Sequence, residues 1–112
     1  MRGKKNKIQY YVYVIALDKK VVESKKFRLK NPSMSPRGKC YYVGQSYLNP
    51  EIRFQQHMRG YKSNSLVKKY GIKLCKRLFQ KYNPITTRNE ALIIEQELTE
   101  KLRRKGHGVW SN

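Results

Sequence analysis

The chain has 112 residues, enough for one small domain but too few for two separate cores. Its 26 Lys and Arg residues against 7 Asp and Glu give a formal charge of +19, which attracts polyanions. No apolar run approaches the roughly 18 residues of a membrane span, and no apolar leader with a cleavage site follows the basic start. We expect a soluble intracellular, cytoplasmic protein whose partner is nucleic acid and not a membrane. The alternative explanations of the charge are simple solubility or binding to anionic lipid.

A packed fold is predicted, because 38% of the residues are hydrophobic and 12% are aromatic. We treat residues 1–112 as a single domain in which residues 1–7 form a basic arm. Cys40 and Cys75 lack the spacing of a metal site and fall in strand-like segments. They are therefore expected to be reduced packing thiols.

The first strong element covers residues 8–17, which are β-branched and aromatic and contain no Gly or Pro. Both of its faces are largely apolar, which is typical of a central strand. Residues 18–39 give a weaker signal, with short strand pieces at 21–22 and 27–29 and a surface loop at 31–38. We interpret 18–39 as an insertion between two paired strands, either a solvated loop or a nucleic-acid-facing one.

A second strand is predicted at 39–45, followed by a helix from Asn49 to about Met58 that stops at Gly60. Asn49 is a suitable N-cap, and Pro50 suits the first helical position. On this helix Arg53 and His57 are four residues apart and therefore share a face.

The later elements are a short helix over 63–71 capped by Ser63, a third strand over 72–82, and a long helix over 87–105. The long helix begins with a capping box formed by Thr87 and Glu90, and a short tail follows it.

The expected fold class is α+β, a mixed α/β sandwich-like arrangement. A small, mainly antiparallel three-stranded sheet is flanked by helices.

Glu95 falls on the apolar side of the long helix, about 40° from Ala91 at 100° per residue. Four of the seven acids lie in residues 90–112. Apart from Glu95 these are Glu90, Glu97 and Glu100, which fall on the opposite, solvated side of the helix. A buried carboxylate must be paired, protonated or bound to metal. The ordinary explanation is a boundary Glu paired with a nearby base. In a basic chain of this kind, we expect Glu95 to be a ligand for Mg²⁺.

A phenol at Tyr42, the Arg53 guanidinium and the His57 imidazole together indicate phosphate chemistry. These residues and their order resemble the GIY-YIG nuclease family. Tyr11-Val12-Tyr13 and Tyr42-Val43-Gly44 stand where the two family tripeptides would be. Arg53 with His57, then Glu95 and finally Asn112 are similar to the residues that follow in the family.

The resemblance implies an endonuclease that hydrolyses phosphodiester bonds in DNA with one divalent ion, Mg²⁺ or Mn²⁺. It implies catalytic roles for Tyr13, Tyr42, Arg53, His57 and Glu95, with Glu95 also holding the metal. Tyr13 would activate or orient water, Tyr42 would help place it, and Arg53 would stabilise charge on the phosphoryl oxygens. The residues expected to bind nucleic acid are Lys39, Arg53, Arg59, Lys62, Lys68 and Asn112.

The chain departs from the family pattern at Tyr11, which replaces a glycine, and in the long 18–39 segment. No separate DNA-binding domain is apparent, so specificity would come from this domain, the insertion, a flanking domain or a partner protein. The two tyrosines could instead be core aromatics, His57 a helix-surface residue, and Arg53 a partner of Glu51. The alternative function is a non-catalytic nucleic-acid-binding protein on the same fold.

Overall fold

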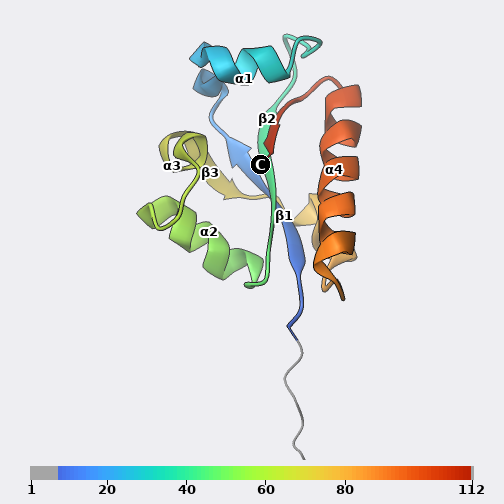
Figure 1. The fold of residues 1–112 in the computed structure, drawn as a ribbon. Coiled ribbons are helices and arrows are strands. Elements are labelled where there is room, and N and C mark those ends of the chain that lie inside the picture. The colour runs from blue at the N-terminus through green and yellow to red at the C-terminus, as the bar shows by residue number, and fades with distance from the viewer. Residues whose placement is uncertain (1–7, 112) are drawn as a thin grey trace, which may run out of the picture.

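The computed structural model describes residues 8–111 and has a four-stranded mixed sheet with the strand order β3-β1-β2-β4. Helix α4 covers one face of the sheet, and α1, α2 and α3 lie on the other side (Figure 1). The α+β class is therefore confirmed. The strands are β1 (Tyr11–Leu17), β2 (Cys40–Ser46), β3 (Gly71–Leu74) and β4 (Gly108–Ser111). The helices are η1 (Lys19–Glu23), α1 (Lys25–Lys30), α2 (Pro50–Arg59), α3 (Ser65–Tyr70), η2 (Lys76–Leu78), η3 (Gln80–Tyr82) and α4 (Arg88–Arg104).

Strand β1 occupies the centre of the sheet, as its two apolar faces predict. It pairs antiparallel with β2, and the register places Tyr13 opposite Gly44 and Val14 opposite Val43. Because directly paired residues share a face, Tyr13 and Gly44 lie on one side of the sheet and the two valines on the other. The Tyr13 side faces α2, and we call it the α2 face. The valine side faces α4 and is called the α4 face (Figure 1).

The expected three-stranded sheet has a fourth strand, because the segment predicted as a short tail forms β4. This strand runs parallel to β2, with Cys40 paired to Gly108 and Val43 paired to Ser111. The Gly108 amide donates to the Lys39 carbonyl oxygen at 2.8 Å, which starts the pairing. Four residues cannot hold an extended conformation by themselves, so β4 depends on the edge that β2 offers.

The 18–39 segment is helical rather than built from short strands. Val21 in η1 and Phe27 in α1 are fully buried. The Asn31 side chain that follows α1 accepts from the Val109 amide at 2.8 Å and from Arg103 Nε at 3.1 Å. The segment is thus fastened to α4 and β4, and the loop prediction holds only for the stretch after Asn31.

The third predicted strand is much shorter than residues 72–82. β3 ends at Leu74, and the chain continues through the 3-10 helices η2 and η3. The helices α2 and α4 match the prediction, with Asn49 and Thr87 as N-caps. Asn64, not Ser63, caps α3. Within residues 8–111, no helix is both long and apolar enough to cross a bilayer.

Candidate active site

Tyr13 and Tyr42 lie side by side on the α2 face, at neighbouring positions of β1 and β2. Their ring centroids are 6.1 Å apart, and both side chains are buried, at 1% and 0% exposure. The glycine of the second tripeptide makes room for this pair. A Cβ at Gly44 would stand 2.6 Å from the Tyr13 hydroxyl oxygen and 2.9 Å from the Tyr42 ring. The sequence Tyr42-Val43-Gly44 therefore determines where the Tyr13 hydroxyl can rest.

His57 enters the same cluster from α2. Its Nε2 lies 2.9 Å from the Tyr13 hydroxyl oxygen in a hydrogen bond, and its ring centroid is 5.4 Å from that of Tyr42. The Ser63 hydroxyl donates to the Asn64 carbonyl oxygen, and its oxygen lies 3.4 Å from His57 Nδ1. The Asn64 backbone amide donates to His57 Nδ1 at 3.4 Å, so Nδ1 carries no proton in this arrangement and the protonated Nε2 faces the Tyr13 hydroxyl oxygen.

Burial sets the charge of this cluster. The pKa of His57 falls to about 4, chiefly because the ring is desolvated and secondly because Arg53 is near. Burial, followed by the neighbouring Tyr42, raises the pKa of Tyr13 well above its ordinary value, and Arg53 opposes this only in part. His57 is therefore neutral at physiological pH. The interpretation of His57 as a helix-surface residue is wrong, because its side chain is fully buried.

Arg53 supplies the positive charge beside the cluster. Its Nη2 donates to the Lys62 carbonyl oxygen at 2.8 Å, and its Nη1 contacts Gln56 Oε1 at 3.1 Å and the Tyr61 carbonyl oxygen at 3.3 Å. These bonds fix the guanidinium and leave N–H donors free for an anion. The expected alternative partner, Glu51, instead forms an ion pair with Lys76.

Glu95 is buried on α4, at 6% exposure, as its place on the apolar side predicted. Among residues 8–111, no cation or hydrogen-bond donor contacts its carboxylate. Desolvation by burial raises its pKa to about 7. Glu95 is therefore a buried carboxylate without a partner in this part of the chain, and it is about half protonated at neutral pH. Carboxylate oxygens are the ligands that a hard cation prefers. In the described part of the chain, no group of three or more His, Cys, Asp or Glu gathers around it.

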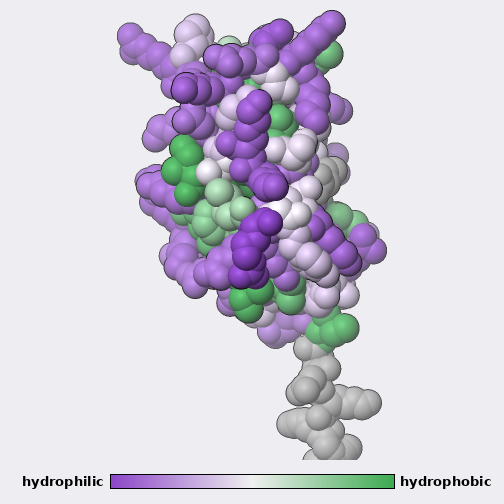
Figure 2. Space-filling model, turned by 90° about the vertical axis from the view of Figure 1, so that its left-hand side faces the viewer, coloured by the Kyte–Doolittle hydropathy of each residue, from purple (hydrophilic) through white to green (hydrophobic). Residues whose placement is uncertain are grey.

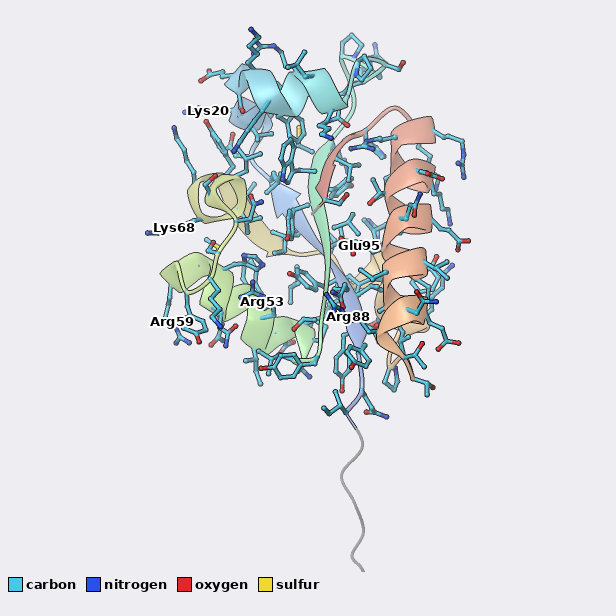
Figure 3. All side chains as sticks on the ribbon, in the orientation of Figure 1. Lys20, Arg53, Arg59, Lys68, Arg88 and Glu95 are labelled. Atoms are coloured by element: carbon cyan, nitrogen blue, oxygen red, sulfur yellow. The ribbon has the colours of Figure 1, made fainter. Side chains whose placement is uncertain are left out.

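Glu95 and the tyrosine cluster occupy opposite faces of the sheet. Figure 3 places Glu95 on the sheet-facing side of α4 and Arg53 on α2, beyond the sheet. Strand β4 pairs with β2 only as far as Val43, so among residues 8–111 the end of β2 that leads to α2 has no partner strand on its outer side. The structure therefore brings Tyr13, Tyr42, Arg53 and His57 together directly. It places Glu95 on the other face of the sheet.

A cavity of about 610 Å³ lies at this end of the sheet. Three cations from separate segments line it, namely Arg53, Lys62 and Arg88. Arg88 begins α4 and was not expected as a site residue. A signal for it existed, because a cation in the first turn of a helix opposes the helix dipole and requires another reason to be there.

The residues expected to bind nucleic acid divide into two groups. Arg53, Arg59 and Lys68 lie on the side of the molecule formed by α2 and α3 (Figure 3), and that face is largely hydrophilic (Figure 2). Lys62, on the loop between these helices, joins them. Lys39 lies apart, at the opposite end of β2 from this cavity. Asn112 falls outside the described residues.

No protein-family model matches this chain, and the comparisons with curated proteins and with solved structures also give no match.

Proposed function

We propose that this chain is a metal-dependent endonuclease of the GIY-YIG family that hydrolyses phosphodiester bonds in DNA. The observation that carries the proposal is the contact between Tyr13 and the neutral His57, with Arg53 fixed beside them. The antiparallel neighbours Tyr11-Val12-Tyr13 and Tyr42-Val43-Gly44 support the family assignment, because the resemblance requires them on adjacent strands.

The Tyr13 hydroxyl orients the attacking water. A phenol is a weak base at neutral pH, and burial raises the pKa of Tyr13 further. His57 holds the Tyr13 hydroxyl in place through the hydrogen bond at Nε2, so the phenol can orient the water by a hydrogen bond without losing its own proton. Tyr42 holds the Tyr13 ring and helps place the water.

Arg53 binds the phosphate and stabilises charge that grows on the phosphoryl oxygens. Its guanidinium is held by backbone carbonyl groups, so it need not reorganise during the reaction. The neighbouring cations Lys62 and Arg88 line the same cavity and hold the adjoining backbone phosphates.

Glu95 would hold the divalent ion, because its carboxylate is buried and unpaired among residues 8–111. An Mg²⁺ or Mn²⁺ ion held there would supply Lewis-acid stabilisation of the phosphate and the leaving oxygen, and the buried Glu95 carboxylate would gain a counter-charge.

The test is nicking of supercoiled plasmid DNA by the full chain with Mg²⁺, and with a chelator as the metal-free arm. Glu95→Gln should abolish nicking. Glu97→Gln, an exposed carboxylate on the same helix, should retain it and serves as the matched control. Wild-type nicking by Glu95→Gln would overturn the proposal.

A non-catalytic nucleic-acid-binding protein is the second candidate. The observation that favours it is the full burial of Tyr13, Tyr42 and His57, which is also typical of packing residues. This candidate requires salt-sensitive binding to DNA without cleavage under any divalent ion.

A further inference from the structure

A second basic cavity lies at the other end of β2, where the strand begins. Its volume is about 640 Å³, and residues of β1, β2, β3 and η2 line it together with the loop before β2. Cys40, at that end, is six residues from Ser46, so at roughly 3.3 Å per residue about 20 Å separates the two ends of the strand. The cavity is therefore distinct from the one that contains Arg53 and Arg88.

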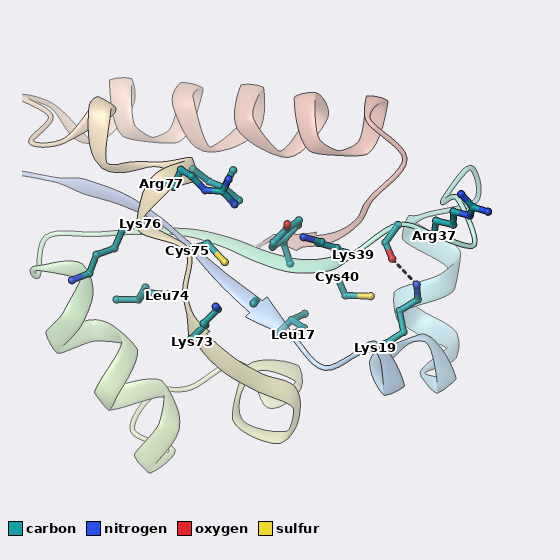
Figure 4. A pocket seen from close by; sticks show the side chains of 14 residues that line it. Leu17, Lys19, Arg37, Lys39, Cys40, Lys73, Leu74, Cys75, Lys76 and Arg77 are labelled. Atoms are coloured by element: carbon teal, nitrogen blue, oxygen red, sulfur yellow. Dashed lines mark hydrogen bonds between the residues drawn. The ribbon is translucent and has the colours of Figure 1, made fainter.

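Three of the cations that line this cavity lie near the thiol of Cys75. Lys39, Lys73 and Arg77 come from three segments, and each acts electrostatically on the thiol of Cys75. Figure 4 shows their charged groups gathered around that thiol. Burial outweighs them and keeps the pKa of Cys75 above its ordinary value, so the thiol stays protonated and is not the anion that they serve.

These three cations also lack partners of their own. Among residues 8–111, the side chains of Lys39, Lys73 and Arg77 form no ion pair or hydrogen bond. Three other cations line the cavity: Lys76 is paired with Glu51, Lys19 donates to the Pro36 and Gly38 carbonyl oxygens, and the Arg37 side chain, among residues 8–111, also has no ion pair or hydrogen bond. No Asp or Glu lines the cavity. Three like charges that share a hollow repel one another unless an anion lies between them.

We infer that this cavity is a phosphate-binding exosite for the nucleic-acid backbone, formed by Lys39, Lys73 and Arg77. The inference rests on the proposed function only in taking nucleic acid as the polyanion. The exosite holds the strand away from the point of cleavage, and its contacts position the substrate without reading sequence. Lys39, which does not line the first cavity, would bind the nucleic-acid backbone here.

The first experiment measures alkylation of Cys75 by iodoacetamide in the Cys40→Ser background, where Cys75 is the only thiol. The protein also carries Glu95→Gln, so that bound DNA is not cut. A DNA duplex should slow alkylation of Cys75 several-fold at low salt. Lys73→Gln with Arg77→Gln should abolish this protection. The ratio of rates with and without DNA is compared for each protein, because these substitutions also alter the basal reactivity of the thiol.

The matched control is Lys25→Gln with Lys81→Gln, which removes the same charge from exposed positions outside the cavity. The control should retain protection. Equal protection in all three proteins would overturn the inference. So would protection by inorganic phosphate with none by DNA, because the cavity would then serve a small anion.

A second measurement needs no cysteine variant and keeps the inference testable if Cys40→Ser fails to fold. Each phosphate contact contributes about 0.9 to the slope of log affinity against log salt. Lys73→Gln with Arg77→Gln should reduce the magnitude of that slope by about one to two. The same variant should bind DNA roughly tenfold or more weakly at about 0.1 M salt. The control pair should leave the slope unchanged, and an identical change in both pairs would overturn the inference.

The two proposals fail separately. A chain that shows protection of Cys75 but never nicks DNA contradicts the nuclease and leaves the exosite standing. A chain that nicks DNA without protecting Cys75 contradicts only the exosite.

Discussion

Gly44 lies opposite Tyr13 in the antiparallel pair of β1 and β2, and the Tyr13 hydroxyl rests on this position, which has no side chain. A Cβ there would stand 2.6 Å from the Tyr13 hydroxyl oxygen. The backbone of β2 cannot yield easily here, because Gly44 is paired to β1 and the preceding residue, Val43, is paired to both β1 and β4. The hydrogen bond between Tyr13 and His57 therefore depends on a glycine two residues after Tyr42.

Gly44→Ala should lower both stability and cleavage. Overpacking of a core position costs typically about 1–3 kcal/mol, and the displaced Tyr13 would lose its hydrogen bond to His57. Thermal unfolding and plasmid nicking measure the two effects. Combining Gly44→Ala with Tyr13→Ala should cost less than the sum of the single changes. Strict additivity would show that the two side chains do not compete for this space.

Tyr13→Phe keeps the ring and removes the hydroxyl. We expect nicking to fall by about 10²–10⁴, which is the usual contribution of a positioned acid or base. The free energy of unfolding should fall by about 1–3 kcal/mol, because His57 Nε2 loses its buried partner. Tyr11→Phe is the control, since its hydroxyl makes only an exposed 3.4 Å contact with Gln9. Unchanged nicking by Tyr13→Phe would exclude its role in the reaction.

Glu95 should make the stability of the metal-free protein depend on pH. Burial raises its pKa from 4.5 to about 7, so the folded state binds its proton more tightly than the unfolded state. The stabilisation is complete below about pH 4.5 and is lost as the pH rises to about 7, for a total of about 3 kcal/mol.

Denaturant unfolding at several pH values measures this effect, with Glu95→Gln as the comparison. The variant should lack this part of the pH dependence. Addition of Mg²⁺ above neutral pH should stabilise the wild-type chain and not the variant, because the ion binds only the folded carboxylate. Parallel pH profiles for the two proteins would contradict the burial of an ionisable Glu95.

Arg53→Ala should reduce turnover far more than DNA affinity. Loss of one fixed donor to the developing phosphoryl charge costs about 10²–10³ in rate, whereas loss of one backbone contact weakens binding roughly tenfold. Arg59→Ala is the matched control on the same helix and should affect binding only. Equal losses of turnover and affinity in Arg53→Ala would reduce its role to a phosphate contact.

Asn31→Ala should loosen the 18–39 segment from the rest of the fold. The Asn31 side chain donates to the Phe27 carbonyl oxygen and accepts from Val109 and Arg103. Its removal leaves a buried amide without a partner, at a cost of about 1–3 kcal/mol. Hydrogen exchange at the Val109 amide should accelerate, while exchange in the centre of β1 should follow only the global loss of stability.

The sequence alone determined the elements whose signals are local. The helices α2 and α4 begin at Asn49 and Thr87 because those side chains cap the first amide groups of each helix. The strands β1 and β2 follow from runs of β-branched and aromatic residues. The burial of Glu95 followed from helix periodicity, and the shared face of Arg53 and His57 from a spacing of four residues.

Only the tertiary structure decided the elements that depend on distant partners. β4 exists because β2 presents an open edge, and α1 is fixed because Phe27 and Asn31 meet α4 and β4. The neutrality of His57 results from burial, which a helical wheel does not reveal. Long-range packing places Arg88 in the same cavity as Arg53. It likewise places Lys39 in the same cavity as Lys73 and Arg77. No local sequence pattern predicts either grouping. Local sequence therefore specified which groups this protein carries, and long-range packing decided which of them share a cavity.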